Sequence, residues 1–203
     1  MVSAERDRPD VARRRRWWRR WQESADPRDV EGCIFIDETA LRTDLTRTRG
    51  RAPKGERLPG AVPSARWRTS TLVAAMGLNG VTCSMAMEGA MNREAFELFV
   101  EKVLVPRLVP GQTVVMDNLS AHRGRRVRRL IRAAGCRVAY LPPYSFDLNP
   151  IELLFSKLKA LLRGVAARTI EALWQAAGAV ANAVTPAETA NFFNACGYRT
   201  RYS

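Results

Sequence analysis

Two short apolar segments of the chain each end in an aspartate. IFID ends at Asp37 and VVMD ends at Asp117. A carboxylate at the end of a buried strand is costly unless it is paired, hydrogen-bonded or bound to a metal. Either aspartate alone is more typical of a turn. Two of them in one strongly basic chain favour a site for Mg²⁺, which prefers oxygen ligands and assists reactions at phosphodiesters.

A third carboxylate would be needed to hold two such ions, and the segment LPPYSFDLNPIELLFSKLK at 141–159 offers two candidates. Asp147 lies in an irregular run, where aspartate commonly caps a turn. Glu152 is the third residue of a predicted helix that has Asn149 at its N-cap and Pro150 at its first position. This is also the pattern of a capping box, in which Glu152 would accept a hydrogen bond from the backbone N–H of Asn149.

Helical spacing divides the predicted helix after Pro150 into two faces. Glu152 begins a polar face that continues through Ser156 to Lys159 and Arg163. The apolar face comprises Ile151, Leu154, Phe155, Leu158 and Leu162. The polar face is typical of a metal-binding glutamate followed by contacts to a DNA backbone, and equally of a face exposed to solvent.

The elements that must position these acids follow from hydrophobic periodicity and turn residues. Strands are predicted at 32–37, 69–78, 81–88, 113–117 and 136–141, and helices at 92–108, 123–135, 150–163 and 169–194, the last interrupted at Pro186. Asn79-Gly80 predicts a hairpin between the second and third strands. A hairpin followed by strands that alternate with helices indicates an α/β fold, with a mixed sheet and helices on its faces.

The charge of the chain indicates a polyanionic partner. The 203 residues carry a formal charge of +13, and the sequence pI is near 10.7. Nucleic acid is favoured over a membrane, because no apolar run approaches the roughly 20 residues that a span needs. Residues 1–30 are rich in arginine and are predicted to form either an arm that contacts DNA or a linker helix. Residues 31–203 are expected to form one domain, with an extended basic loop at 42–68.

The cysteines and the N-terminus indicate an intracellular protein. Cys33, Cys83, Cys136 and Cys196 are far apart, and only one histidine could help them bind a metal. This pattern favours buried thiols in a reducing compartment. The first residues are charged and lack the apolar core of a signal peptide.

Three motifs together resemble one protein family. They are FIDET at 35–39, VVMDNLSAH at 114–122 and LPPYSFDLNPIELLFSKLK at 141–159, and 34 residues separate Asp117 from Glu152. In this order and at this spacing they look like the catalytic domain of mariner-superfamily transposases, specifically the bacterial insertion-sequence branch. The resemblance covers roughly residues 32–165.

The resemblance implies a ribonuclease H-like fold, with a mixed five-stranded sheet flanked by helices, and a DDE-type nuclease and strand transferase. Asp37, Asp117 and Glu152 match the family's three metal-binding acids in a DD34E arrangement, and Asp147 matches a motif residue that is not a ligand. Two Mg²⁺ ions are implied, for which Mn²⁺ can substitute. The implied reaction cuts double-stranded DNA at terminal inverted repeats and joins the freed 3′-hydroxyls to target DNA at TA dinucleotides.

Other residues receive supporting roles. We expect Asn118 to orient Asp117 or a bound water, and Asn149 to support the acids. His122 is either structural or takes part in catalysis or DNA contact. The basic loop at 42–68 matches a segment that reaches the partner subunit in mariner-type enzymes, so it is expected to contact a second protomer or DNA. The expected DNA contacts are Arg49, Arg51, Lys54, Arg123, Arg125, Lys159 and Arg163.

The sequence departs from the family pattern in three places. Phe146 stands where proline is common, and 49–54 lacks the frequent aromatic residue. The helix-turn-helix domains that recognise the element's ends in such transposases are not seen in 1–30. This suggests the second reading frame of an element that uses frameshifting, or a truncated copy. The expected location is the nucleoid in the cytoplasm of a bacterium.

Two other functions fit the same residues. One is a non-transposing ribonuclease H-like nuclease that acts on DNA or on RNA–DNA hybrids. The other is an inactive DNA-binding remnant of a transposase. The presence of Asp37, Asp117 and Glu152 together argues against the remnant, since decay would not be expected to spare all three.

Overall fold

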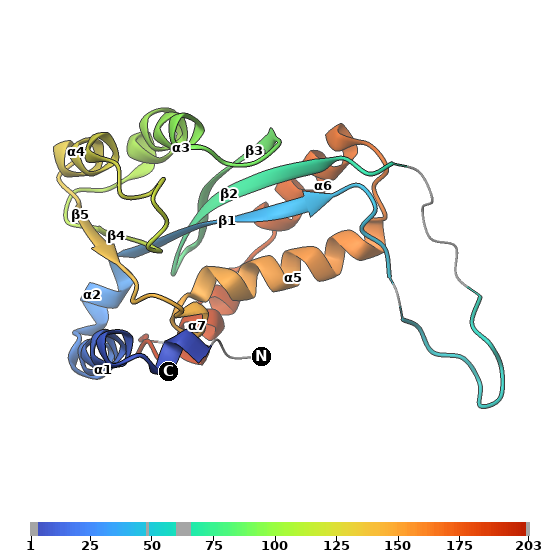
Figure 1. Cartoon of the computed structure of the whole chain (residues 1–203), viewed down its shortest axis with the longest axis horizontal. Helices are drawn as coiled ribbons and strands as arrows, with labels where there is room; N and C mark the ends of the chain where they lie inside the picture. The colour runs from blue at the N-terminus through green and yellow to red at the C-terminus, as the bar shows by residue number, and fades with distance from the viewer. Residues whose placement is uncertain (1–3, 48, 60–65, 202–203) are drawn as a thin grey trace.

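A five-stranded sheet forms the centre of the fold in a computed structural model that describes residues 4–47, 49–59 and 66–201 (Figure 1). The strands are β1 (Cys33–Arg42), β2 (Thr69–Gly77), β3 (Gly80–Glu88), β4 (Thr113–Met116) and β5 (Arg137–Tyr140). Their order across the sheet is β3-β2-β1-β4-β5. The β1, β2 and β3 strands pair antiparallel, whereas β1, β4 and β5 pair in parallel. The expected mixed five-stranded sheet is confirmed.

The register of β1 and β4 brings the two strand-end aspartates together. Ile36 pairs with Met116 across the parallel ladder, and the next residue of each strand is the aspartate. β1 continues to Arg42, beyond the predicted end at residue 37, because its second half pairs with β2. Asp37 is therefore inside a long central strand, while Asp117 follows the last residue of a short one.

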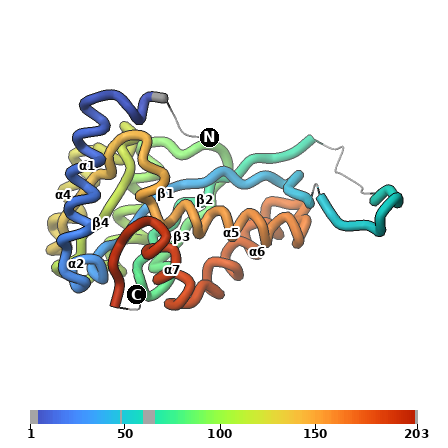
Figure 2. Tube along the Cα trace, turned by 90° about the horizontal axis from the view of Figure 1, so that it is seen from below, coloured from blue at the N-terminus to red at the C-terminus, as the bar shows by residue number. Residues whose placement is uncertain are grey.

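Helices cover both faces of the sheet. On one face lie α3 (Arg93–Phe99) and α4 (Arg125–Ala133), and on the other lie α1 (Pro9–Ser24), α5 (Pro150–Val165), α6 (Ile170–Asn182) and α7 (Pro186–Ala195) (Figures 1 and 2). Alternate residues of β1 contribute to the two cores: Ile34 and Ile36 pack on the α3 side, and Phe35 packs on the α5 side. Asp37 and Glu38 consequently belong to opposite faces.

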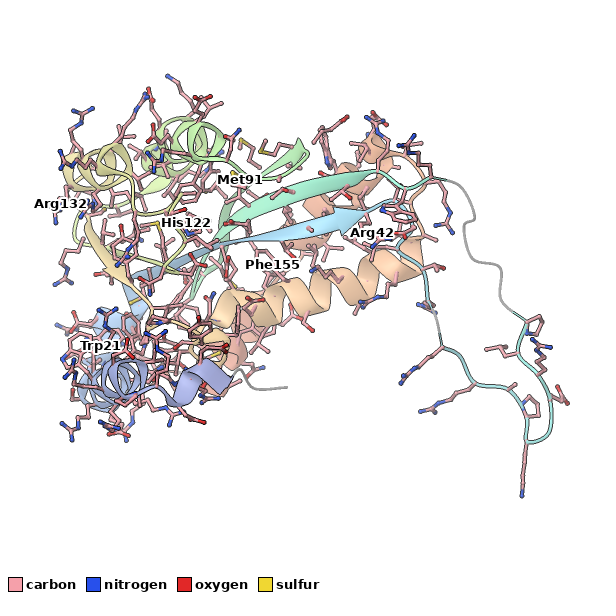
Figure 3. The ribbon with its side chains drawn as sticks, in the orientation of Figure 1. Trp21, Arg42, Met91, His122, Arg132 and Phe155 are labelled. Carbon is pink, nitrogen blue, oxygen red and sulfur yellow. The ribbon has the colours of Figure 1, made fainter. Side chains whose placement is uncertain are left out.

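The helices follow the sequence pattern closely. In α5 the five residues of the predicted apolar face are all buried, and Phe155 lies between the helix and the sheet (Figure 3). The helix expected at 92–108 continues from α3 as a π-helical segment, Val100–Leu104, and a 3₁₀ turn, Val105–Arg107. Pro106 accounts for the change at its end, since proline cannot continue an α-helical ladder. The predicted hairpin is present, and Gly80 takes the positive φ of 115° that its turn requires.

The arginine-rich N-terminal segment is a helix that shares the core of the domain. Trp18 is buried, and its indole N–H donates to the hydroxyl of Tyr198 at 2.9 Å. That hydroxyl in turn donates to the carbonyl of Leu148 at 2.7 Å. Gln22 donates to the carbonyl of Cys196 at 2.9 Å. A short helix, α2 (Pro27–Glu31), then leads into β1. The start and the end of the described chain are thus packed together beside the segment that precedes α5.

The predicted basic loop connects β1 to β2. The described part at 49–59 extends away from the body of the fold (Figures 1 and 2) and consists of exposed residues. Residues 48 and 60–65 of this loop, like 1–3 and 202–203 of the predicted segments, lie outside the described residues. In the part of the chain that the structure describes, no helix is both long and apolar enough to cross a membrane.

Candidate active site

Asp37 is a buried carboxylate held by two hydrogen-bond donors. Its Oδ1 accepts from the backbone N–H of Glu38 at 2.8 Å, and its Oδ2 accepts from the side-chain amide of Asn149, also at 2.8 Å. Burial raises the pKa of Asp37 to about 7 against the effect of the Glu38 N–H, and the charges of Asp117, Glu152 and Glu38 raise it further. The three predicted acids therefore lie close enough for their charges to interact.

Asp117 is paired with the single histidine of the chain. Its Oδ1 accepts from the backbone N–H of Leu119 at 2.9 Å and lies 2.5 Å from Nδ1 of His122. The other ring nitrogen, Nε2, lies 2.9 Å from Oε2 of Glu38. The imidazole is fully buried on the α3 side, with its ring centroid 4.2 Å from that of Phe96 (Figure 3). His122 thus bridges Asp117 to the face of β1 opposite Asp37.

The two carboxylate partners of His122 favour the imidazolium form. Burial lowers the pKa of His122, but the hydrogen bonds to Asp117 and Glu38 outweigh it and raise the pKa to about 9. Both ring nitrogens can then donate, one to each acid. The backbone of His122 is also fixed, because its carbonyl accepts from the hydroxyl of Tyr140 at 3.2 Å. The imidazolium therefore orients Asp117 and neutralises charge beside the acids.

Glu152 is on the first turn of α5, as predicted, but the capping-box alternative is wrong. The side chain of Asn149 makes no bond to the helix, and no bond from Glu152 to the cap residue is present. Asn149 instead points its amide N–H at Asp37. The backbone N–H of Asn149, which Glu152 would have to bond in a capping box, donates instead to the carbonyl of Phe146 at 3.1 Å. Burial and the charge of Asp117 raise the pKa of Glu152 against the opposing effect of Lys159.

Asn118 contacts a different partner from the one expected. Its amide donates to the carbonyl of Leu141 and so ties the end of β4 to the end of β5. The sequence could not indicate this bond, because it depends on the parallel pairing of two strands that are far apart in the chain.

Asp147 is bound by arginines of the N-terminal segment. Arg15 donates to Oδ1 at 2.9 Å and to Oδ2 at 2.6 Å, and it also donates to Oγ of Ser145 at 2.7 Å and to the carbonyl of Tyr144 at 3.2 Å. Arg6 donates to Oδ2 at 2.9 Å. The Arg15 side chain is only 6% exposed. This cluster fixes the segment before α5, and sequence reasoning missed it.

A cleft of about 450 Å³ opens over Asp37 and Asp117. One wall is the segment that leads from β5 to α5, where the exposed side chain of Phe146 lies at the cleft. The opposite wall is the start of α1, which contributes Arg8 and Val11. The N-terminal helix is therefore part of the site, which the sequence did not indicate.

The chemistry of these side chains fits a divalent cation. Carboxylate oxygens are the ligands that Mg²⁺ prefers, and a cation would offset both the burial that mainly raises the pKa of Asp37 and the smaller repulsion from its neighbouring acids. Oδ1 of Asn149 is buried beside Asp37 and has no hydrogen-bond partner. Among the residues that the structure describes, no three Asp, Glu, His or Cys side chains are already grouped to hold an ion.

The predicted DNA contacts lie on three separate surfaces, and all are at least partly exposed. The residues on the loop extend away from the cleft, Lys159 and Arg163 lie within α5, and Arg123 and Arg125 lie at the start of α4. The guanidinium of Arg123 lies 5.7 Å from the ring centroid of Tyr140. The structure does not bring the three groups together.

Comparison with known sequences decides the family. The sequence profile of the DDE superfamily endonucleases matches residues 33–174, which is more than half of the chain and includes the three acids. The chain belongs to the DDE superfamily endonucleases. No curated protein sequence matches this DDE endonuclease.

Solved structures place this DDE endonuclease in a ribonuclease H-like fold. The Mos1 strand transfer complex matches with a TM-score of 0.74 and 15% identity, and the Mos1 transposase paired-end complex with the left transposon end matches with 0.71 and 16%. Each covers 97% of this chain and 60% of the other. The Mos1 transposase catalytic domain with raltegravir and Mg matches with 0.63 and 14% identity, covering 97% of this chain and 90% of that one. The chain thus spans about three-fifths of the full-length Mos1 chains.

Glu38 contacts His122 beside the acids, and sequence reasoning did not select it. A signal was available, because Glu38 directly follows Asp37 in the FIDET motif, and alternation along a strand sends the two side chains to opposite faces. For Arg15 the signal was helical spacing, since Val11, Arg15, Trp18 and Gln22 lie on one face and all are buried.

Proposed function

We propose that this DDE endonuclease is the catalytic domain of a transposase that cleaves DNA at the ends of a mobile element and joins those ends to target DNA. The observation that carries the proposal is the placement of Asp37 and Asp117 at one level of neighbouring parallel strands, with Glu152 close enough to affect the pKa of Asp37. Three carboxylates whose charges interact, in a basic protein, fit the handling of a phosphodiester.

Asp37, Asp117 and Glu152 would hold two Mg²⁺ ions, for which Mn²⁺ can substitute. Bound ions would stabilise charge on the phosphodiester and lower the pKa of the attacking hydroxyl group. The protein's own contribution is to position the acids. Asn149 fixes one oxygen of Asp37, and His122 fixes one oxygen of Asp117. The orientation of the metal-binding groups then does not have to be established during the reaction.

The sequence motifs support four more specific features of the proposal. These features are the DD34E triad, transfer to TA sites, membership of the bacterial insertion-sequence branch, and a location in the bacterial nucleoid. A homodimer with the loop at 42–68 reaching the second protomer is proposed on the same basis, as is a helix-turn-helix region encoded upstream. The similarity to Mos1 structures that contain transposon ends supports double-stranded DNA as the partner.

A non-transposing nuclease of the same fold is the second candidate. It would use the same acids and differ only in the fate of the cleaved end. A strand-transfer assay with pre-cleaved element ends separates the two, because only a transposase joins the 3′-hydroxyl to a second DNA.

The deciding experiment measures Mg²⁺- or Mn²⁺-dependent cleavage of element-end DNA by the parent and by Asp37→Asn, Asp117→Asn and Glu152→Gln. Each variant should lose nearly all cleavage, because each removes a charged ligand while it keeps the shape of the side chain. Asp44→Asn is the matched control, since Asp44 pairs only with the exposed Arg42 in its described contacts. Full activity of all three variants would exclude the metal site.

Metal binding itself gives an independent measurement. Mn²⁺ should raise the melting temperature of the parent, because a ligand that binds the folded state stabilises it. Asp37→Asn should abolish this rise, whereas Asp44→Asn should keep it. An equal rise in both variants would place the ion elsewhere.

A further inference from the structure

A second groove of about 510 Å³ continues from the cleft over the acids. Asn118, Leu141 and Pro142 line both spaces, so the two are continuous along the end of the sheet. One wall of the second groove is α1, and the other is the end of β5 with the loop after β4. The described residues that line it further are Arg13, Arg14, Trp17, Trp18, Arg123 and Tyr140.

The lining combines cations with aromatic surfaces. Three arginines line the groove, and no acid is among its described lining residues. Trp17 is 64% exposed, although Trp18 beside it is buried in the core. The exposed indole of Trp17 lines the same groove as the three arginines, so an aromatic surface is available beside positive charge. Another arginine-lined hollow, over α4, contains no aromatic residue.

These features match a single nucleic-acid strand better than a duplex. Sites for single strands join a positively charged groove to aromatic side chains on which bases stack. In a duplex the base faces are covered by their neighbours, and only phosphates and groove edges are available.

We propose that the groove formed by Arg13, Arg14, Trp17, Arg123 and Tyr140 binds an unpaired segment of the DNA strand that enters the active site. Arginines contact its phosphates, and one base stacks on Trp17. Tyr140 connects this groove to the acids, because its hydroxyl donates to the carbonyl of His122, whose ring holds Asp117. The proposal deepens the proposed function, since it states which form of DNA lies beside the acids.

Binding is tested in EDTA, so that the result does not depend on cleavage. Fluorescence anisotropy measures the affinity of the full chain for a labelled oligothymidine strand and for a blunt duplex of equal length. Trp17→Ala should weaken binding of the single strand roughly tenfold and change duplex binding less than about twofold, because only an unpaired base can stack. Trp17→Phe should retain most of the affinity.

Arg132→Ala is the matched control, because Arg132 lines the hollow over α4, whose described lining contains no aromatic residue, and does not line the groove (Figure 3). It should weaken both DNA forms to a similar extent through lost phosphate attraction. A parent that fails to bind the single strand would overturn the proposal. So would a Trp17→Ala variant that binds the strand normally, or one that loses strand and duplex affinity equally. A parent that binds the single strand but does not cleave element-end DNA would instead count against the proposed function.

Discussion

The side chain of Asn149 bonds an acid of the candidate site and does not cap the helix that it begins. It occupies the N-cap of α5, yet its amide donates to Asp37 and leaves the helix uncapped. Asn92 occupies the same position on α3 and does cap its helix, by accepting from the N–H of Ala95 at 2.8 Å. The chain therefore contains two N-cap asparagines with different tasks.

Alanine substitution should separate these tasks. Asn92→Ala should lower the free energy of unfolding by about 1 kcal/mol and leave the response to Mn²⁺ unchanged. Asn149→Ala should weaken the apparent Mn²⁺ affinity by roughly 10- to 100-fold, because Asp37 loses the donor that orients it. Thermal unfolding with and without Mn²⁺ measures both quantities. An equal effect of the two variants on Mn²⁺ binding would contradict this assignment.

The pairing of Asp147 with Arg15 predicts a pH-dependent stability. Burial raises the pKa of Asp147, but the hydrogen bond and charge of Arg15 outweigh it, so that the folded-state pKa lies below the ordinary value of 3.8. A lowered pKa stabilises the fold above the ordinary value, and this contribution is lost as the pH falls through the lower folded value.

Asp147→Asn should therefore lower the free energy of unfolding at pH 7 by about 1 kcal/mol, a modest amount because Asp147 is partly exposed. The difference from the parent should narrow as the pH falls below 3.8. Urea unfolding across this pH range measures it, with Asp44→Asn expected to show little change at any pH. Catalysis by Asp147→Asn should be largely intact. A difference that widens in acid would refute the assigned pairing.

At the scale of elements, α1 is part of the domain. Trp18 packs in the core and bonds to Tyr198, whereas Trp17 projects into solvent. Trp18→Ala should lower the free energy of unfolding by about 3–5 kcal/mol, as is usual for a buried tryptophan. Trp17→Ala should lower it by less than about 0.5 kcal/mol, since an exposed position has little packing to lose. Urea denaturation distinguishes a packed helix from a detached arm, for which both variants would be nearly neutral.

The sequence predicted the elements well because its signals are local. Apolar periodicity located α4 and α5, Asn79-Gly80 located the hairpin, and strand-end aspartates located two of the acids. It failed where a contact depends on distant pairing. The second half of β1 was missed because only its ladder with β2 makes it a strand. Asn149 was expected to support the acids, but its bond to Asp37 could not be named, because a local pattern cannot show a partner 112 residues away.

At the scale of the whole molecule, the charge of +13 is spread over several surfaces. Arginines cover the outer face of α4, while others line the cleft and the loop at 49–59. Some positive charge is already neutralised within the protein, for example where Arg68 donates to Glu88 at 2.6 and 2.7 Å.

DNA affinity should consequently fall steeply with salt, because phosphate contacts release counterions. Arg132→Ala should reduce the slope of log K against log salt concentration by about one. Arg68→Ala should reduce it less, since its charge is paired within the chain. Anisotropy titrations at a series of KCl concentrations measure the slopes, and an affinity that does not depend on salt would exclude a phosphate-dominated interface.

The N-terminal end of the described chain is anchored at the segment that forms one wall of the cleft, because Arg6 is bound to Asp147. The C-terminal end lies elsewhere, since Arg201 pairs with Glu31, which precedes β1. A domain fused at the N-terminal end would therefore begin its linker beside the acids. A short flexible linker then gives a high effective concentration of the fused domain's DNA at the cleft. A DNA-binding module of chosen specificity fused at the N-terminal end would therefore present its DNA to the cleft over Asp37 and Asp117.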